Sequence, residues 1–213
     1  GELNGWGAPT WPMSGSLGGT FIYLTGQLTA PSDPISEFKF FKDAGAWFGN
    51  GAPVNIGQIF SGLNQSGGNS SFNYIQFLWY AFKWNGNDRG VIFQFNGPPA
   101  SVANVSATPN VVTAADFVTV FANLTSNLPA GQAVWLRHTT NNFATSTVVK
   151  MAGGGTSVSA VIPPHPAGVT VSYYVFTAGD VASIAPGDAD LMTVNFNNNG
   201  GANYTYFVTG AST

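Results

Sequence analysis

The chain has 213 residues, which is enough for one large domain or for two domains of about 100 residues each. Charged residues make up only 7% of it, and the formal net charge is −3. Six scattered Lys and Arg residues cannot form the basic stripe that nucleic-acid binding requires, and no apolar run of about 18 residues could span a bilayer. The absence of cysteine excludes disulfides, thiolate metal sites and a cysteine nucleophile.

Short runs rich in β-branched and aromatic residues recur along the chain, and each is closed by Gly, Asn, Pro or Ser. No amphipathic helical pattern exceeds two turns, so the sequence predicts an all-β protein. In the first half the predicted strands are 20–25, 37–41, 46–48, 53–59, 79–84 and 91–95.

The segment NGPPAS, residues 96–101, predicts a domain boundary, because two prolines stiffen the chain and forbid a central strand there. The expected domains are residues 1–98 and 99–213. Predicted strands in the second domain are 102–107, 117–124, 133–139, 147–151, 157–162, 169–177, 191–196 and 203–208. This strand density is typical of a two-sheet sandwich, and we expect two tandem antiparallel β-sandwich domains.

The stretch EFKFFKDAGAWFGNG, residues 37–51, places Phe38 and Phe40 on one side of an extended chain and Glu37 and Lys39 on the other. It then places Trp47 among glycines. This tryptophan could serve as core, as a platform for a flat ligand, or as a contact between copies of the protein. Five of the six tryptophans precede residue 100, so the first half is the better candidate for ligand binding.

The segments LNGWGAPTWPMSGSLGGTFIYLTGQL and EFKFFKDAGAWFGNG resemble the glycogen-binding type of carbohydrate-binding module, found in starch-branching enzymes and in the AMP-activated kinase. The resemblance implies a glucan-binding face formed by Trp6, Lys39 and Trp47, with Asn87 as a further member. An indole ring stacks on the apolar side of a pyranose, while Lys or Asn can bond the hydroxyls. A core role for Trp6 and Trp47 is the competing interpretation.

Two departures from that family bear on assembly. The family has a strand before LNGW that this chain does not supply, and residues 60–80 form a long insert. An open sheet edge would then be covered by the insert or by a neighbouring molecule. We expect the neighbour to donate the strand from its GNSSFNYIQFLWY or YTYFVTGAST segment. Within WYAFKW, Trp79 and Trp84 are five residues apart and face opposite sides of a strand, so at most one of them belongs to the core.

The second half contains VTVFANLTSNLPAGQAVWLRHTTNNFATSTVVKM and SAVIPPHPAGVTVSYYVF, followed by NNNGGANYTYFV. These segments resemble the immunoglobulin-like or fibronectin-type-III-like modules of secreted bacterial proteins. Such modules mostly space, present or assemble other domains. The turn chemistry of Asn and Gly predicts a hairpin that leads into Tyr204 and Tyr206.

Catalytic residues are scarce. A glycosidase needs two carboxylates across a cleft, and the only glutamates are Glu2 and Glu37. Asp180, Asp188 and Asp190, in GDVASIAPGDADL, could bind calcium. An ordinary Asx-turn loop explains the same residues, and their spacing matches no known calcium-binding loop. We expect His138 and His165 to be surface residues.

The sequence therefore predicts a non-catalytic, cofactor-free extracellular or cell-surface protein, mature after removal of a signal peptide. We expect it to bind copies of itself as a filament, tube or sheath subunit. The alternative is a glucan-binding module pair from a secreted polysaccharide-processing or cell-surface protein. The candidate assembly residues are Ile75, Phe77, Trp79, Trp84, Tyr204 and Tyr206.

Overall fold

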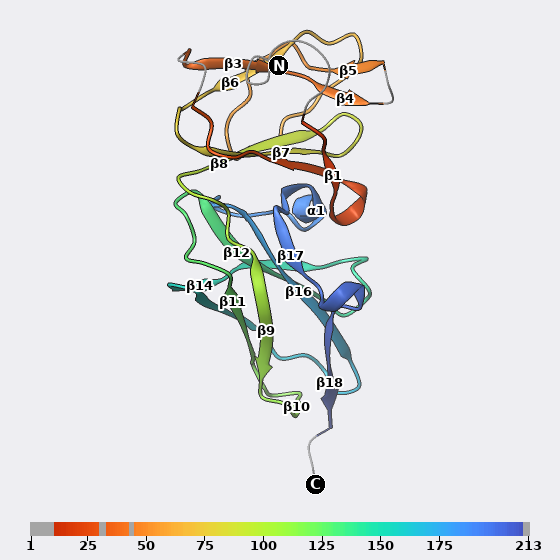
Figure 1. Ribbon diagram of the computed structural model, residues 1–213. Coiled ribbons are helices and arrows are strands. Elements are labelled where there is room, and N and C mark those ends of the chain that lie inside the picture. Colours follow the sequence, from red (N-terminus) through yellow and green to blue (C-terminus); the bar gives the residue numbers. More distant parts are fainter. Residues whose placement is uncertain (1–10, 30–32, 43–44, 211–213) are drawn as a thin grey trace. The chain divides into compact units, whose positions relative to one another are not determined.

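The structure is a computed structural model that describes residues 11–29, 33–42 and 45–210 (Figure 1). Strands dominate it, which confirms the all-β fold class. No helix in these ranges is long and apolar enough to cross a membrane.

The chain divides into two compact units. Unit 1 is Gly1–Pro99 together with Pro129–Gly131 and Asp190–Val194, and unit 2 is Ala100–Leu128, Gln132–Ala189 and Asn195–Thr213. Two short segments of the second half thus belong with unit 1, which the prolines at the boundary did not indicate. That residues 1–98 and 99–213 are two separate domains stays a prediction.

Unit 1 contains a four-stranded antiparallel sheet and two strand pairs. The sheet has the order β1-β2-β7-β8, with β1 (Ser14–Gly15), β2 (Phe21–Leu24), β7 (Trp79–Trp84) and β8 (Gly90–Phe95). The pairs join β3 (Ile35–Phe38) to β6 (Ser70–Asn73) and β4 (Phe40–Lys42) to β5 (Ala46–Phe48).

Aromatic rings fill the core of unit 1. Phe38 lies edge-on to Phe40, Phe60, Phe72 and Phe82, with ring centres 5.6 to 5.9 Å apart. Such edge-to-face pairs add to the free energy of burying the rings, and they bind the strand pairs to the sheet in a chain without disulfides.

One sheet edge of unit 1 is covered by residues 57–60, which lead into the insert. The amide of Gly57 donates to the carbonyl of Ile92 over 2.8 Å, and Phe60 and Gly90 exchange two backbone bonds of 2.9 and 3.0 Å. The edge expected to be open for lack of a strand before LNGW is a different one, and its cover stays a prediction. At β8 the chain itself satisfies the backbone groups.

Unit 2 consists of two sheets. One has the order β14-β15-β11-β9 and the other β10-β18-β16-β12-β13, with β17 beside β16. All pairs are antiparallel except β10 with β18. The strands are β9 (Val102–Thr108), β10 (Val112–Thr113), β11 (Val118–Leu124), β12 (Gln132–Thr139), β13 (Thr147–Lys150), β14 (Ala152–Gly154), β15 (Ser157–Ile162), β16 (Thr170–Gly179), β17 (Asn195–Asn197) and β18 (Tyr204–Thr209).

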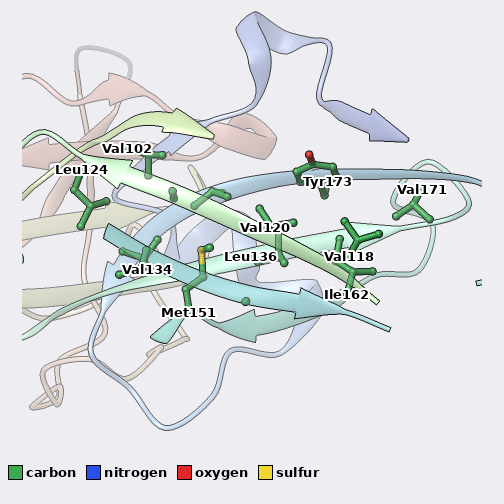
Figure 2. Packing of buried hydrophobic residues seen from close by; sticks show 14 of the residues in the cluster. Val102, Val118, Val120, Leu124, Val134, Leu136, Met151, Ile162, Val171 and Tyr173 are labelled. Atoms are coloured by element: carbon green, nitrogen blue, oxygen red, sulfur yellow. The ribbon is translucent and has the colours of Figure 1, made fainter. Parts of the chain in front are cut away.

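The inner faces of these two sheets enclose one apolar core. Figure 2 shows Val118, Val120 and Ile162 of one sheet in the same cluster as Leu136 and Tyr173 of the other. Alternate residues of each strand point inward, so unit 2 is a β-sandwich, as the strand density predicted.

The predicted strand at 191–196 is wrong over its first half. The chain there forms the short helix α1 (Ala189–Met192), and only β17 is extended. Pro186 begins the preceding 3₁₀ turn, and Asp190 lies in the first turn of α1. Proline at the start and a carboxylate in the first turn both favour helical geometry, and this outweighed the β-branched residues that follow.

The predicted strand at 53–59 is also wrong, since only Pro53 forms an isolated bridge there. Gly57 has a φ of 77°, and the amide of Gln58 bonds the carbonyl of Asn55, so the segment turns. Conversely, β6 and β14 were missed because their residues are mostly Ser, Asn, Gly and Ala, which are poor strand signals.

Candidate functional site

Alternation along β3 and β4 builds a solvent-facing surface in unit 1. Phe38 and Phe40 are buried in the core, while Glu37, Lys39 and Phe41 between and beside them are half-buried. Glu37 and Lys39 therefore lie on the side opposite Phe38 and Phe40, as the alternation predicted, and Phe41 lies on the same outer side.

The β4–β5 pair adds Trp47 to the same side. Phe40 lies opposite Phe48, and both contribute to the core. The next pair, Phe41 and Trp47, consequently points the other way, with ring centres 4.6 Å apart. We call Glu37, Lys39, Phe41 and Trp47 the Trp47 face.

Beside this face, glycines allow two backbone segments to approach closely. Gly49 and Asn64 exchange two backbone bonds of 3.2 and 3.0 Å, and a Cβ on Gly49 would overlap the carbonyl oxygen of Gly68. The same Cβ would lie 3.2 Å from Cε of Lys39, so the lysine stem lies across Gly49. Only glycine permits this approach of two backbone segments.

A second polar group borders the face. The Asn69 side chain donates from Nδ2 to Oε2 of Glu37 over 2.9 Å. The amide and carboxylate are thereby held in a fixed orientation. The resulting surface combines two adjacent aromatic rings with an ammonium, a carboxylate and an amide, which are the groups that bind sugar rings and hydroxyls.

The other two predicted members of the sugar site do not join the described face. Trp6 lies outside the described residues. Asn87 lies in the turn after β7, where its carbonyl accepts the indole N–H of Trp84 over 3.0 Å. Trp84 stacks on Phe40 with ring centres 5.3 Å apart. That contact is on the inward side of β4, opposite the side of Phe41.

The candidate assembly residues differ in their exposure. Ile75 and Phe77 are exposed, and Trp79 is half-buried. Trp84 is a core residue at 3% exposure, which agrees with at most one of the two tryptophans being buried and removes Trp84 as an exposed contact. Tyr204 and Tyr206 are half-buried and pack on Tyr173, at 5.6 and 6.3 Å between ring centres.

Both proposed strand donors are paired inside their own units. Ser70–Asn73 pairs with β3, and Tyr204–Thr209 lies between β10 and β16. Neither segment is a spare strand in this structure, so a donor strand would first have to break its own hydrogen bonds.

The aspartates considered as calcium ligands are not grouped as a metal site. Lys150 forms an ion pair with Asp180. Within the described ranges, no three or more His, Asp or Glu side chains are grouped so that they could hold a metal ion.

The histidines are placed differently from the surface positions expected. His138 is only 5% exposed, and its ring centre is 6.0 Å from that of His165, which is half-buried. Burial, together with the nearby His165, lowers the pKa of His138 to about 4. The expectation of a surface residue is therefore wrong for His138.

A buried lysine was also missed. Lys83 on β7 is fully buried, and its Nζ donates to Oγ of Ser16 over 2.9 Å and to Oγ1 of Thr20 over 3.2 Å. Burial lowers the pKa of Lys83 to about 7, against an opposing effect of Asp190. The sequence signal was the nearly unbroken apolar run WYAFKW, which is typical of a strand covered on both faces.

A search against protein-family models finds no match to this chain, and a search of curated proteins finds none either.

Proposed function

We propose that the protein is a non-catalytic polysaccharide-binding protein whose binding site is the Trp47 face. The observation that carries this proposal is the pairing of Phe41 with Trp47 on the outer side of β4 and β5, beside Lys39. Two rings 4.6 Å apart offer apolar area for a pyranose, and the charged groups at the rim can bond its equatorial hydroxyls.

The test is retention of the intact chain on insoluble starch, cellulose or chitin, and its mobility in gels that contain glycogen. Trp47→Ala should weaken binding at least about tenfold, which corresponds to about 1.4 kcal/mol, because the ring is lost while the fold remains. Trp47→Phe should retain part of the affinity. Phe207→Ala, which removes a ring that is 56% exposed on unit 2, is the matched control and should bind as the unchanged protein does.

Circular dichroism of Trp47→Ala should keep its β-type spectrum. The Trp47 face is not a sugar site if the unchanged protein binds none of starch, cellulose, chitin and glycogen. The same conclusion follows if Trp47→Ala binds as well as the unchanged protein.

Self-association is a second candidate function, and a different surface supports it. Phe117, directly before β11, is 64% exposed, Phe121 of β11 is 39% exposed and Val161 of β15 is 45% exposed. Val161 lies directly opposite Thr119, between the two phenylalanines in register. We call these three side chains the Phe117 patch.

The strands around this patch carry no charge. The segments VANVSAT, VTVFANL and SVSAVI of β9, β11 and β15 contain no Lys, Arg, Asp or Glu. Charged residues on exposed strands normally oppose association between copies, and these three strands carry none, although Asp116 directly precedes Phe117. The proposed partner is a second copy of the chain.

Sedimentation velocity over a range of concentrations tests this candidate. Replacing Phe117 and Phe121 by Ser should shift the protein toward the monomer, whereas Phe207→Ser should not, although it removes a similarly exposed ring. A purely monomeric unchanged protein at the highest concentration would exclude this function, and equal association of all three proteins would exclude this surface.

A further inference from the structure

His138 and His165 are placed together by two different elements of unit 2. His138 lies on β12, where it follows the inward-facing Val134 and Leu136 at alternate positions and lies opposite Tyr173 of β16. Its imidazole therefore points between the two sheets of the sandwich.

His165 approaches from the connection between β15 and β16. This connection reads PPHPAG, so Pro163, Pro164 and Pro166 surround the histidine. Three prolines restrict the backbone dihedrals of the loop, and the amide of Gly168 anchors its end to the carbonyl of Val208 over 2.8 Å. The backbone that carries His165 is thus restricted before any ligand binds.

Both imidazoles leave a nitrogen without a partner. The Nε2 atoms of His138 and His165 are buried and form no hydrogen bond. Burying a polar atom without a hydrogen-bond partner costs about 1 to 3 kcal/mol of folding free energy. A ligand bound by both nitrogens would remove this cost at the two atoms.

We propose that His138 and His165 form a two-ligand site for a soft monovalent d¹⁰ cation, Cu(I) in nature and Ag(I) as its air-stable analogue, bound through the two Nε2 atoms. Metal–imidazole bonds of about 2 Å on each side suit rings whose centres are 6.0 Å apart. Two-coordinate ions impose no angle between the ring planes, so the observed 69° is compatible with binding.

The number of ligands selects the ion. Zinc requires four ligands, of which at least three come from the protein, and no such group exists among the described residues. Cu(I) and Ag(I) are satisfied by two nitrogens in line. A single positive charge also costs less to transfer into the sandwich than a double one. In a chain without cysteine, imidazole and methionine are the remaining ligands for such ions.

The test is calorimetric titration of the intact chain with silver nitrate in a chloride-free buffer. We expect one Ag(I) bound per chain, and in ¹⁵N spectra the Nε2 resonances of both histidines should shift together. His165→Gln, a change in a half-buried loop residue, should weaken binding at least about a hundredfold, and Zn(II) should show no comparable affinity. His138→Gln should behave like His165→Gln.

Met151→Leu is the control, since it removes a buried thioether of the same unit and should leave Ag(I) binding unchanged. The proposal is overturned if Ag(I) does not bind, if His165→Gln binds it within about threefold of the unchanged protein, if Met151→Leu abolishes binding, or if Zn(II) binds equally tightly.

Discussion

Lys83 shows how a single buried side chain sets the pH dependence of stability. Its pKa in the folded chain is about 7, whereas the ordinary pKa of a lysine is 10.5. Between these values the unfolded chain binds a proton that the folded chain does not. The free energy of unfolding therefore rises with pH through this window, by at most about 1.4 kcal/mol per pH unit, and the charged lysine destabilises the fold fully at and below about pH 7.

We predict that Lys83→Met removes this dependence and is more stable than the unchanged protein at pH 7. Denaturant unfolding followed by tryptophan fluorescence at pH 7, 8 and 9 measures the difference between the two proteins. The range stops below pH 10 because burial raises the pKa of Tyr80 to about 12, which acts in the opposite direction. Parallel curves for both proteins would contradict the assignment to Lys83.

Gly49 lies where any side chain would clash with the backbone of Gly68. We predict that Gly49→Ala destabilises unit 1 by about 1 to 3 kcal/mol, because its Cβ would overlap the carbonyl of Gly68. Gly26→Ala is the control, since a Cβ there meets nothing within 4 Å and no positive φ has to be maintained. Equal melting temperatures for the two variants would show that the loop moves aside at little cost.

At the scale of elements, β18 is a structural strand of unit 2. It lies between β10 and β16, and Val208 is fully buried. We predict that deletion of residues 207–213 unfolds or strongly destabilises unit 2, because the strand loses its pairing with Val112 and Thr113 and the core loses Val208.

Near-ultraviolet circular dichroism and thermal melting of the truncated chain measure this effect. Phe207→Ser keeps the strand and should melt close to the unchanged protein. A truncated chain that stays folded and loses self-association would instead support strand donation by this segment.

In the whole molecule, the two compact units are not separated at one position in the sequence, because unit 1 includes segments from the second half of the chain. The amide of Asn96 bonds the carbonyl of Ala130 over 3.1 Å, and Ala130 donates in return to the Asn96 side chain. Thr20 also bonds the carbonyl of Asp190 over 3.4 Å. All of these residues belong to unit 1, although two of them follow Pro99 in the chain.

A fragment of residues 1–98 lacks Pro129–Gly131 and Asp190–Val194. We predict that it melts at a lower temperature than unit 1 does in the intact chain, as followed by tryptophan fluorescence. A fragment as stable as the intact chain would show that these segments add nothing to unit 1.

The all-β class, most strands and the alternation that places Glu37 and Lys39 opposite Phe38 and Phe40 follow from the sequence, whereas the side on which Trp47 lies follows from the pairing of β4 with β5. The first three are local properties, because the period of two and the turn residues are set by sterics within a few residues. The glycine contact beside Lys39, by contrast, joins Gly49 to Gly68 and could not be read from either segment alone.

The burial of particular polar residues depends on long-range packing. The run WYAFKW indicates a strand covered on both faces but does not place the Lys83 ammonium, and no local pattern marks His138 as buried. Their surroundings depend on partners far along the chain, Ser16 in one case and His165 in the other. Pairing between distant strands is set by the packing of the whole core, in which long-range side-chain fit outweighs local propensity. For the same reason β6, with its polar sequence, was recognisable only from its pairing with β3.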